Sequence, residues 1–309
     1  MSNGDLRIVS LIPSGTEILA ALGLTDAIVG RSHECDYPPE IQDRPICTQP
    51  RLNTSASSSE INDKINKLIQ SALSIYEIKI EILKRLHPTH IITQDQCDVC
   101  AVSVSEVEKA VASITHTPPE IISLKPNVLK DVWADVERVA NAFGVDSLKV
   151  LENLEARVKI VSQKTQGLSQ TEKLPTVACI EWTDPLMIAA NWIPELVTLA
   201  GGEPLFSTTG QPSSHLKWEN LIASNPDIII FMPCGFDLNR TRQEAELLTQ
   251  HPEWENLRAN QNGRVYITDG NSYFNRPGPR LVDSTEMLAE ILHPEIFQYG
   301  YKGQTWELL

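Results

Sequence analysis

The sequence is short of positive charge. It holds 26 lysine and arginine residues against 40 aspartate and glutamate residues, which gives a net charge of −14 over 309 residues. Because nucleic acids and anionic membranes attract basic protein surfaces, this balance argues against both as partners. No apolar run approaches the roughly 20 residues that span a bilayer, so we expect no membrane insertion.

The N-terminal residues lack the features of an export signal. The segment MSNGDLRIVSLIPSG has no charged start, no long apolar stretch and no small-residue cleavage site. This start predicts a cytoplasmic protein, or a periplasmic one if a leader sequence has been lost. In a cytoplasmic protein, the six cysteines are expected to be reduced thiols.

Common catalytic and nucleotide-binding motifs are also missing. The chain has no G-x-x-x-x-G-K-[ST], G-x-G-x-x-G, G-x-S-x-G or H-E-x-x-H sequence. His33, beside Glu34 and Cys35, is the one cluster that resembles a nucleophile and its base, and a single loop triplet does not establish catalysis. The pattern therefore favours a binding protein over an enzyme.

What the sequence does have is a regular alternation of strand and helix patterns. Residues 6–12 form an apolar run typical of a buried strand, and the following helical pattern ends at Gly23. The segment 225–231 (NPDIIIF) is the counterpart of 87–93 (HPTHIIT), and both lead into a loop that contains a cysteine. Two similar halves follow from this repetition.

We therefore predict an α/β fold of two Rossmann-like lobes joined by a long α-helix. The N-terminal lobe covers residues 1–126, a helical linker covers 127–173, and the C-terminal lobe covers 174–309. Apolar residues recur at helical spacing through most of the linker. A helix of about 18 residues reaches roughly 27 Å, enough to pass from one lobe to the other.

The order of several motifs resembles one protein family. The segments SLIPSGTEILAALGL, SHECDYPPE, THIITQDQCDVCAVS, NPDIIIFMPCGF and DGNSYFNRPGPRLVD follow one another as in the cobalamin-binding (vitamin B12 and iron-siderophore) branch of the periplasmic substrate-binding proteins of ABC importers. The resemblance implies the class III form of that fold, with a rigid helical backbone and a shallow cleft between the lobes. It also implies a soluble protein that holds a cobalamin-like corrinoid, or a related metal chelate, with an ABC permease as candidate partner.

The loops that follow the predicted strands are the expected ligand site, since open α/β sheets bind ligands beyond the carboxyl ends of their strands. Aromatic residues gather in these loops although the chain is only 6% aromatic, and flat apolar faces suit a macrocycle. Alternatively, Trp182 and Trp192 cover the core, and Arg276 pairs with nearby acids. The predicted ligand-binding residues are Ser14, Thr16, Glu34, Tyr37, Trp182, Trp192, Phe236, Tyr273, Phe274 and Arg276.

Carboxylates outnumber arginines in the same loops. Such a site should repel a highly anionic ferric chelate and tolerate a neutral corrinoid or a cation. The alternative is that many of these acids cap helix N-termini, as Asp and Glu commonly do. The acids are Glu17, Glu34, Asp36, Asp95, Asp98, Glu181, Asp184, Asp237 and Asp269, against Arg31, Arg240, Arg276 and Arg280.

Four cysteines in the predicted cleft loops suggest a second function. Cys97 and Cys100 form a Cys-x-x-Cys pair, which is a common half-site for zinc or an iron–sulfur cluster, and Cys35 and Cys234 would complete the site. The alternative is that all four are small, partly buried thiols. Cys47 and Cys179 are expected in the core. A cytoplasmic metalloprotein or enzyme with a cleft zinc or iron–sulfur site therefore stands as the second hypothesis.

Overall fold

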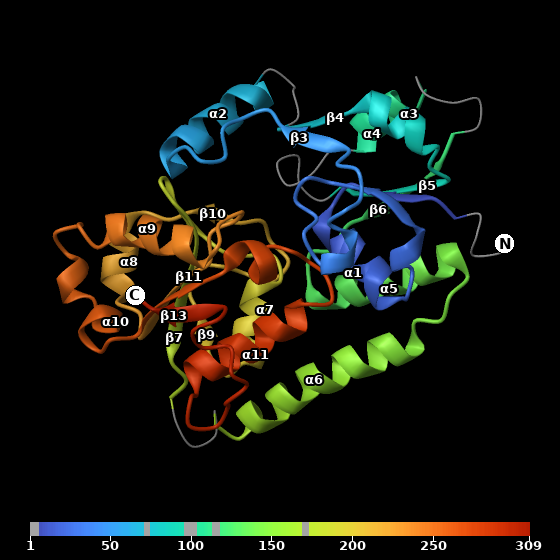
Figure 1. The fold of residues 1–309 in the computed structure, drawn as a ribbon. Coiled ribbons are helices and arrows are strands. Elements are labelled where there is room, and N and C mark those ends of the chain that lie inside the picture. The colour runs from blue at the N-terminus through green and yellow to red at the C-terminus, as the bar shows by residue number, and fades with distance from the viewer. Residues whose placement is uncertain (1–5, 71–74, 96–103, 113–117, 169–172) are drawn as a thin grey trace. The chain divides into compact units, whose positions relative to one another are not determined.

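The computed structural model describes residues 6–70, 75–95, 104–112, 118–168 and 173–309 (Figure 1). These residues belong to two compact units. Unit 1 consists of residues 1–126 and 130–151, and unit 2 consists of residues 127–129 and 152–309. Among the described residues, none of the helices combines the length and apolar character needed to cross a membrane.

Unit 1 is built on a parallel sheet with the strand order β2-β1-β5-β6. Side chains of β1 alternate between two cores: Ile8 packs with residues of α1 and α5, whereas Val9 packs with residues of α3 and α4. Helices therefore cover both faces of the sheet (Figure 1). The elements are β1 (Ile8–Ser10), α1 (Pro13–Ala21), η2 (Thr25–Ala27), β2 (Ile28–Arg31), η3 (Pro39–Ile41), β3 (Thr48–Pro50), α2 (Ser58–Gln70), β4 (Tyr76–Ile78), α3 (Ile80–Leu86), β5 (His90–Gln94), α4 (Val104–Ala112), β6 (Glu120–Leu124) and α5 (Leu129–Phe143).

Unit 2 has a larger, mixed sheet. Parallel strands β7, β11 and β12 lie at its centre, and the antiparallel strands β8 and β13 flank them. One face packs on α8, α9 and α10. On the other face, a Cβ at Gly202 would lie within 3.0 Å of Val177, Val197 and Leu292, so glycine permits close packing of β7 with α7 and α11. The elements are β7 (Thr176–Thr183), β8 (Leu186–Ile188), α7 (Ile193–Leu199), β9 (Glu203–Pro204), β10 (Ser214–His215), α8 (Trp218–Ser224), β11 (Ile228–Phe231), α9 (Leu238–Leu248), η5 (Trp254–Asn256), α10 (Arg258–Gln261), β12 (Val265–Thr268), η6 (Gly270–Phe274), α11 (Leu281–Leu292) and β13 (Trp306–Leu308).

Helix α6 (Leu148–Gln166) continues from unit 1 into unit 2. Within unit 2, Arg157 of α6 forms ion pairs with Asp283 and Glu286 of α11, at 2.6 and 2.5 Å. The long helix lies in the segment predicted as the linker, 127–173. The predicted fold class, two α/β lobes joined by a long helix, is confirmed.

Several segments take a form that local sequence patterns do not indicate. Residues 76–78 form β4 and pair antiparallel with β3, and residues 186–188 form β8 and pair with β7. Residues 270–274 form the π-helical turn η6, and residues 238–248 form the helix α9.

Candidate functional site

The loops predicted to bind ligand follow the carboxyl ends of parallel strands within each unit. In unit 1, Ser14 lies just after β1, and residues 32–37 follow β2. In unit 2, Trp182 lies at the end of β7, Phe236 follows β11, and Tyr273 follows β12. This is the edge of a parallel sheet at which open α/β proteins bind ligands. Convergence of the loops of both units on one ligand remains a prediction.

The N-terminus of α1 is held firmly against the sheet of unit 1. A Cβ at Gly15 would lie 2.6 Å from Cγ2 of Ile92 in β5, so this position leaves no space for a side chain. Thr16 Oγ1 lies 3.0 Å from Cys35 Sγ and 3.3 Å from the Ile12 carbonyl oxygen. Thr16 and Cys35 are both fully buried and therefore join the start of α1 to the loop after β2.

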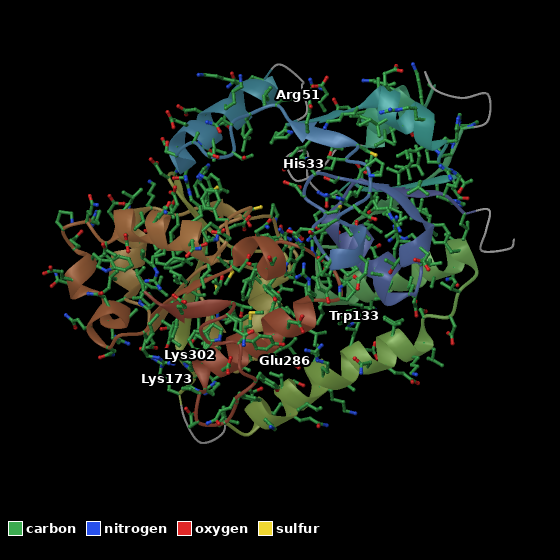
Figure 2. All side chains as sticks on the ribbon, in the orientation of Figure 1. His33, Arg51, Trp133, Lys173, Glu286 and Lys302 are labelled. Carbon is green, nitrogen blue, oxygen red and sulfur yellow. The ribbon has the colours of Figure 1, made fainter. Side chains whose placement is uncertain are left out.

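His33, which is labelled in Figure 2, forms hydrogen bonds to a residue 15 positions further along the sequence, Thr48. Thr48 Oγ1 lies 2.7 Å from His33 Nδ1, accepts a hydrogen bond from the His33 backbone N–H at 3.1 Å and lies 3.1 Å from Ser32 Oγ. The Tyr76 ring lies 5.1 Å from the imidazole, and its hydroxyl donates to Glu34 at 2.8 Å. Burial, together with the nearby charges of Lys79 and Arg31, lowers the pKa of His33 to about 4. The imidazole is therefore neutral at neutral pH.

Buried polar groups gather at the carboxyl edge of unit 1. Ser14 Oγ follows β1, His33 Nε2 follows β2 and Gln94 Nε2 ends β5, which are adjacent strands of the sheet. Each of these atoms is buried without a hydrogen-bond partner among the described residues. A buried polar group without a partner costs about 1–3 kcal/mol, and such groups in native proteins are uncommon. The cluster therefore marks this edge as a surface suited to a polar ligand.

Unit 2 presents an aromatic surface at the corresponding edge. Trp182 is half-buried, its Nε1 donates to the Asp184 carbonyl oxygen at 3.0 Å, and its ring lies 5.2 Å from that of Phe236. The Arg240 guanidinium lies 4.9 Å from the Phe236 ring and forms an ion pair with Glu244 at 2.6 Å. These contacts fix the half-buried indole of Trp182 against the buried ring of Phe236, so Trp182 is the member of this pair that a ligand can touch.

The remaining aromatic residues of unit 2 divide by burial. Trp192 and Phe274 are 6% and 0% exposed, and Trp192 Nε1 donates to the Phe274 carbonyl oxygen at 2.9 Å. The ring of Tyr273, by contrast, is half-buried and lies 5.0 Å from the Arg280 guanidinium. The two buried rings therefore hold η6 against the start of α7, and Tyr273 is the residue of η6 that offers ring surface. Ligand contact by Trp192 and Phe274 stays a prediction.

The predicted ligand-binding residues differ in how much of each residue is exposed to solvent. Tyr37, at 44%, is the one exposed member. Glu34, Trp182 and Tyr273 are half-buried and have surface that can touch a ligand directly. The other members are buried and support the loops in the structure described: Ser14, Thr16, Trp192, Phe236, Phe274 and Arg276.

Several of the acids assigned to the ligand site have other roles. Asp237 accepts a hydrogen bond from the Arg240 backbone N–H and caps α9, and Asp269 accepts from the Ser272 N–H and caps η6. Helix capping, the alternative for these two acids, is confirmed. Glu181 accepts a hydrogen bond from Ser213, and burial raises the pKa of its carboxyl group. Asp98 lies outside the described residues.

The cysteines give no support to the metal hypothesis. Cys97 and Cys100 lie outside the described residues, whereas Cys35 is buried in unit 1 and Cys234 is partly exposed in unit 2. Within the described ranges, no group of three or more His, Cys, Asp and Glu residues is arranged to hold a metal ion. Burial raises the pKa of Cys47 and Cys179 to about 12, and both belong to the core as predicted.

Sequence reasoning missed the partners that define the unit 1 site. Thr48 and Tyr76 lie 15 and 42 residues beyond the residues that they contact, His33 and Glu34. No local pattern signals these pairs, because β3 and β4 bring them together through antiparallel pairing. Gln94 was also missed, although its position at the end of a buried apolar strand was a usable signal.

Comparisons with known proteins agree with this arrangement. The family model described as "Periplasmic binding protein" matches residues 8–271. An uncharacterized ABC transporter substrate-binding lipoprotein of Bacillus subtilis, YvrC, is 21% identical over 94% of this chain and 81% of its own length. A vitamin B12-binding protein of Photorhabdus laumondii is 22% identical over 93% of this chain and 88% of its own.

Solved structures show the same fold. The crystal structure of IsdE of S. aureus, complexed with heme, has a TM-score of 0.69 and 19% sequence identity, and covers 94% of this chain and 100% of its own. The expectation of a cytoplasmic protein gains no support from these relatives, since the family is described as periplasmic and YvrC as a lipoprotein. Because the family model matches residues 8–271, which are most of the 309 residues, this chain belongs to the periplasmic binding protein family.

Proposed function

We propose that this chain is the substrate-binding protein of an ABC importer and that its ligand is a cobalamin-like corrinoid or a related metal chelate. The family membership supports binding of a small molecule. The vitamin B12 and heme named for the relatives are both metal-centred macrocycles, which supports a chelate ligand for this chain. An ABC permease is the partner that this role requires.

The observation that carries the proposal is the chemistry of the loops at the carboxyl edge of each unit. Unit 1 contributes Ser14, His33 and Gln94, whose buried polar atoms lack partners among the described residues. Unit 2 contributes the half-buried indole of Trp182, which packs against the buried ring of Phe236. A corrinoid offers a broad apolar ring face and polar groups at its periphery, so the chemistry of each edge suits a part of it.

The test is a titration of the purified protein with cyanocobalamin and with hemin, followed by calorimetry and by the visible spectrum. We expect saturable binding of cyanocobalamin with one ligand per chain. A Trp182→Ala variant should bind about 10- to 100-fold more weakly, because aromatic anchor residues dominate such interfaces. Tyr299→Ala is the matched control, since Tyr299 is an exposed aromatic residue that follows α11 rather than a carboxyl-edge strand.

Saturable binding of hemin with no response to cyanocobalamin would support the role as a substrate-binding protein and would identify the ligand as a heme-like chelate rather than a corrinoid. Failure of both macrocycles to bind, or equal affinity of the Trp182→Ala variant, would refute the proposal. The protein should also be purified anaerobically and its metal content measured. The same measurement on a Cys97→Ser, Cys100→Ser variant decides whether a cysteine-bound metal accounts for any colour.

A further inference from the structure

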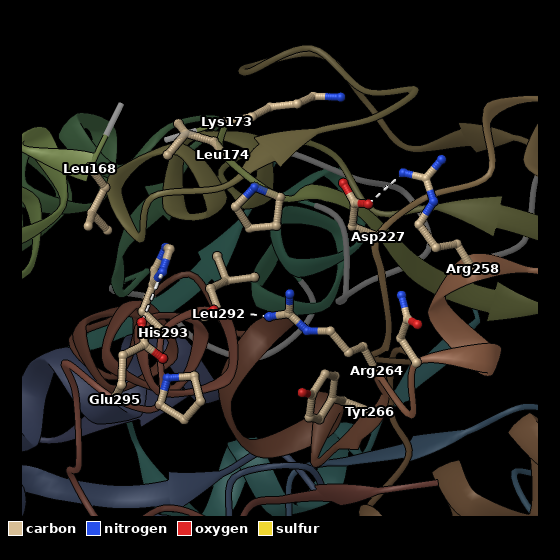
Figure 3. Close-up of a pocket in the computed structure, with 13 residues that line it drawn as sticks. Leu168, Lys173, Leu174, Asp227, Arg258, Arg264, Tyr266, Leu292, His293 and Glu295 are labelled. Atoms are coloured by element: carbon tan, nitrogen blue, oxygen red, sulfur yellow. Dashed lines mark hydrogen bonds and ion pairs between the residues drawn. The ribbon is translucent and has the colours of Figure 1, made fainter. Parts of the chain in front are cut away.

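Unit 2 contains a pocket of about 590 Å³ away from the carboxyl edge of its sheet (Figure 3). Its walls come from the residues that lead into β7, β11 and β12 and from the segment that follows α11, and all of them belong to unit 2. Because the three strands are parallel, the pocket lies at their amino ends. At about 3.3 Å per residue, the six residue steps of β7 from Thr176 to Trp182 separate it from Trp182 by roughly 20 Å.

One ion pair of the pocket is satisfied within the protein. Asp227 accepts hydrogen bonds from the Thr176 N–H and hydroxyl, at 2.9 and 2.8 Å, and pairs with Arg258 at 2.7 Å. Burial by itself would raise the pKa of Asp227, but the bonds from Thr176 and the charge of Arg258 outweigh it and lower the pKa to about 2. The charge of Arg258 is therefore already neutralised by a permanent carboxylate.

Arg264 differs from Arg258 in this respect. Its Nη2 donates to the carbonyl oxygen of Leu292, the last residue of α11, at 3.0 Å. Among the described residues, no carboxylate pairs with this guanidinium, and its Nε and Nη1 have no protein acceptor. Figure 3 shows the side chain extended into the pocket, with the ring of Tyr266 beside it. The chain has a net charge of −14, so a guanidinium without a paired carboxylate in a concave site indicates a binding position for an anionic group.

The surroundings of Arg264 define the chemistry of an occupant. Leu174, Pro175, Leu292 and Pro294 contribute apolar walls. The acid on the far side, Glu295, is 67% exposed and lies 3.8 Å from His293 Nδ1. A guanidinium binds a carboxylate through parallel hydrogen bonds, and the volume lies in the range of small-molecule sites.

We propose that this amino-edge pocket is a second ligand site, which binds a small organic monocarboxylate with its head group on Arg264 and its hydrocarbon part on Leu174, Pro175 and Leu292. This site does not depend on the identity of the carboxyl-edge ligand. Unit 2 would then have two separate sites, one at each end of the parallel strands β7, β11 and β12.

Calorimetric titration with octanoate tests the proposal, with 1-octanol as the uncharged probe of the same chain length. Octanoate should bind saturably and 1-octanol should not. An Arg264→Gln variant should lose at least about tenfold in octanoate affinity, because a charge-assisted hydrogen bond is replaced by a neutral one. Arg242→Gln is the matched control, since Arg242 of α9 pairs with Glu307 of β13 and does not line the pocket.

Trp182→Ala should leave octanoate affinity unchanged, which separates this site from the carboxyl edge. If Arg264→Gln fails to fold by circular dichroism, Arg264→Lys takes its place, and it should weaken binding by several-fold because lysine cannot form the paired hydrogen bonds. Equal binding of octanoate and 1-octanol, full affinity in the Arg264 variant, no saturation by octanoate, or complete displacement of octanoate by equimolar inorganic phosphate would each overturn the proposal.

Discussion

The two units use the same local device to enter their central strands. In unit 1, α3 ends at His87 with a φ of +42°, and Pro88 precedes β5. In unit 2, α8 ends at Asn225 with a φ of +46°, and Pro226 precedes β11. Both left-handed residues donate their N–H groups back into the helix, to Leu83 and Leu221. The proline excludes a right-handed helical residue before it, so each helix must end there.

Beyond this shared entry, the units expose different chemistry at the carboxyl edge. Among the residues that the structure describes, the four-stranded sheet of unit 1 leaves buried polar atoms without partners at three strand ends. The larger mixed sheet of unit 2 carries a fixed aromatic pair and a carboxylate-capped helix there. One strand-and-helix framework thus carries two kinds of surface, because the framework depends on buried strand residues and the surface depends on the loops.

The largest effect should come from the equivalent core positions Ile92 and Ile230, both fully buried. Truncation of either to alanine should lower the free energy of unfolding of its own unit by about 3–4 kcal/mol, through lost burial and a new cavity. Hydrogen exchange measured by mass spectrometry reports on each unit separately. Valine at either position should cost only about 1 kcal/mol. Equal acceleration of exchange in both units by one variant would show that they unfold together.

The two ion pairs of Arg157 in unit 2 should contribute more to the free energy of unfolding than the ion pair between Arg138 and Asp135 in unit 1. Arg157→Met leaves Asp283 and the buried Glu286 without their cation and should destabilise unit 2 by about 2 kcal/mol, after allowance for partial exposure of the arginine. Arg138→Met should cost about 1 kcal/mol at pH 6, since burial already raises the pKa of Asp135 to about 6 and lets it take up a proton. Urea denaturation at pH 6 and pH 8 measures the free energy of unfolding of each variant. Equal losses of stability for Arg157→Met and Arg138→Met would contradict the comparison.

His33 should make unit 1 more sensitive to acid than unit 2. Its pKa of about 4 lies below the unfolded value of 6.5, so the unfolded chain binds more protons, and stability falls as the pH drops from 6.5 to 4. The shift corresponds to at most about 3 kcal/mol, which screening of the partly exposed ring reduces to roughly 1–2 kcal/mol. His33→Gln should flatten this pH dependence in hydrogen exchange of unit 1. His215→Gln, at an exposed position in unit 2, is the control and should change nothing.

The smallest effect concerns the two left-handed helix ends. His87→Gly should stabilise unit 1 by about 0.5 kcal/mol, because glycine adopts a positive φ without steric cost. Asn225→Gly should instead cost unit 2 about 1 kcal/mol, because Asn225 Oδ1 accepts a hydrogen bond from the Arg258 N–H at 2.7 Å. Thermal unfolding measures both, and stabilisation by both glycines would show that the asparagine bond contributes nothing.

Much of the fold could be read from local patterns. The buried strands at 90–94 and 228–231, the glycine stop after α1 and the counterpart segments around Pro88 and Pro226 all follow from apolar periodicity and turn chemistry, which act over a few residues. Strands β4 and β8 could not be read in this way. Each is three residues long, and each exists because an antiparallel partner covers it.

The candidate site was predictable only in outline. The sequence alone determined that polar and aromatic loops follow the strands, since strand ends are visible in the apolar pattern. Only the tertiary structure decided that Trp192 and Phe274 are buried while Trp182 is half-buried, that Thr48 fixes the His33 ring, and that Arg264 lines a pocket with no carboxylate paired to its guanidinium among the described residues. The physical reason is that burial, hydrogen-bond partners and pKa values depend on atoms brought together from distant parts of the chain, and local sequence patterns carry no record of them.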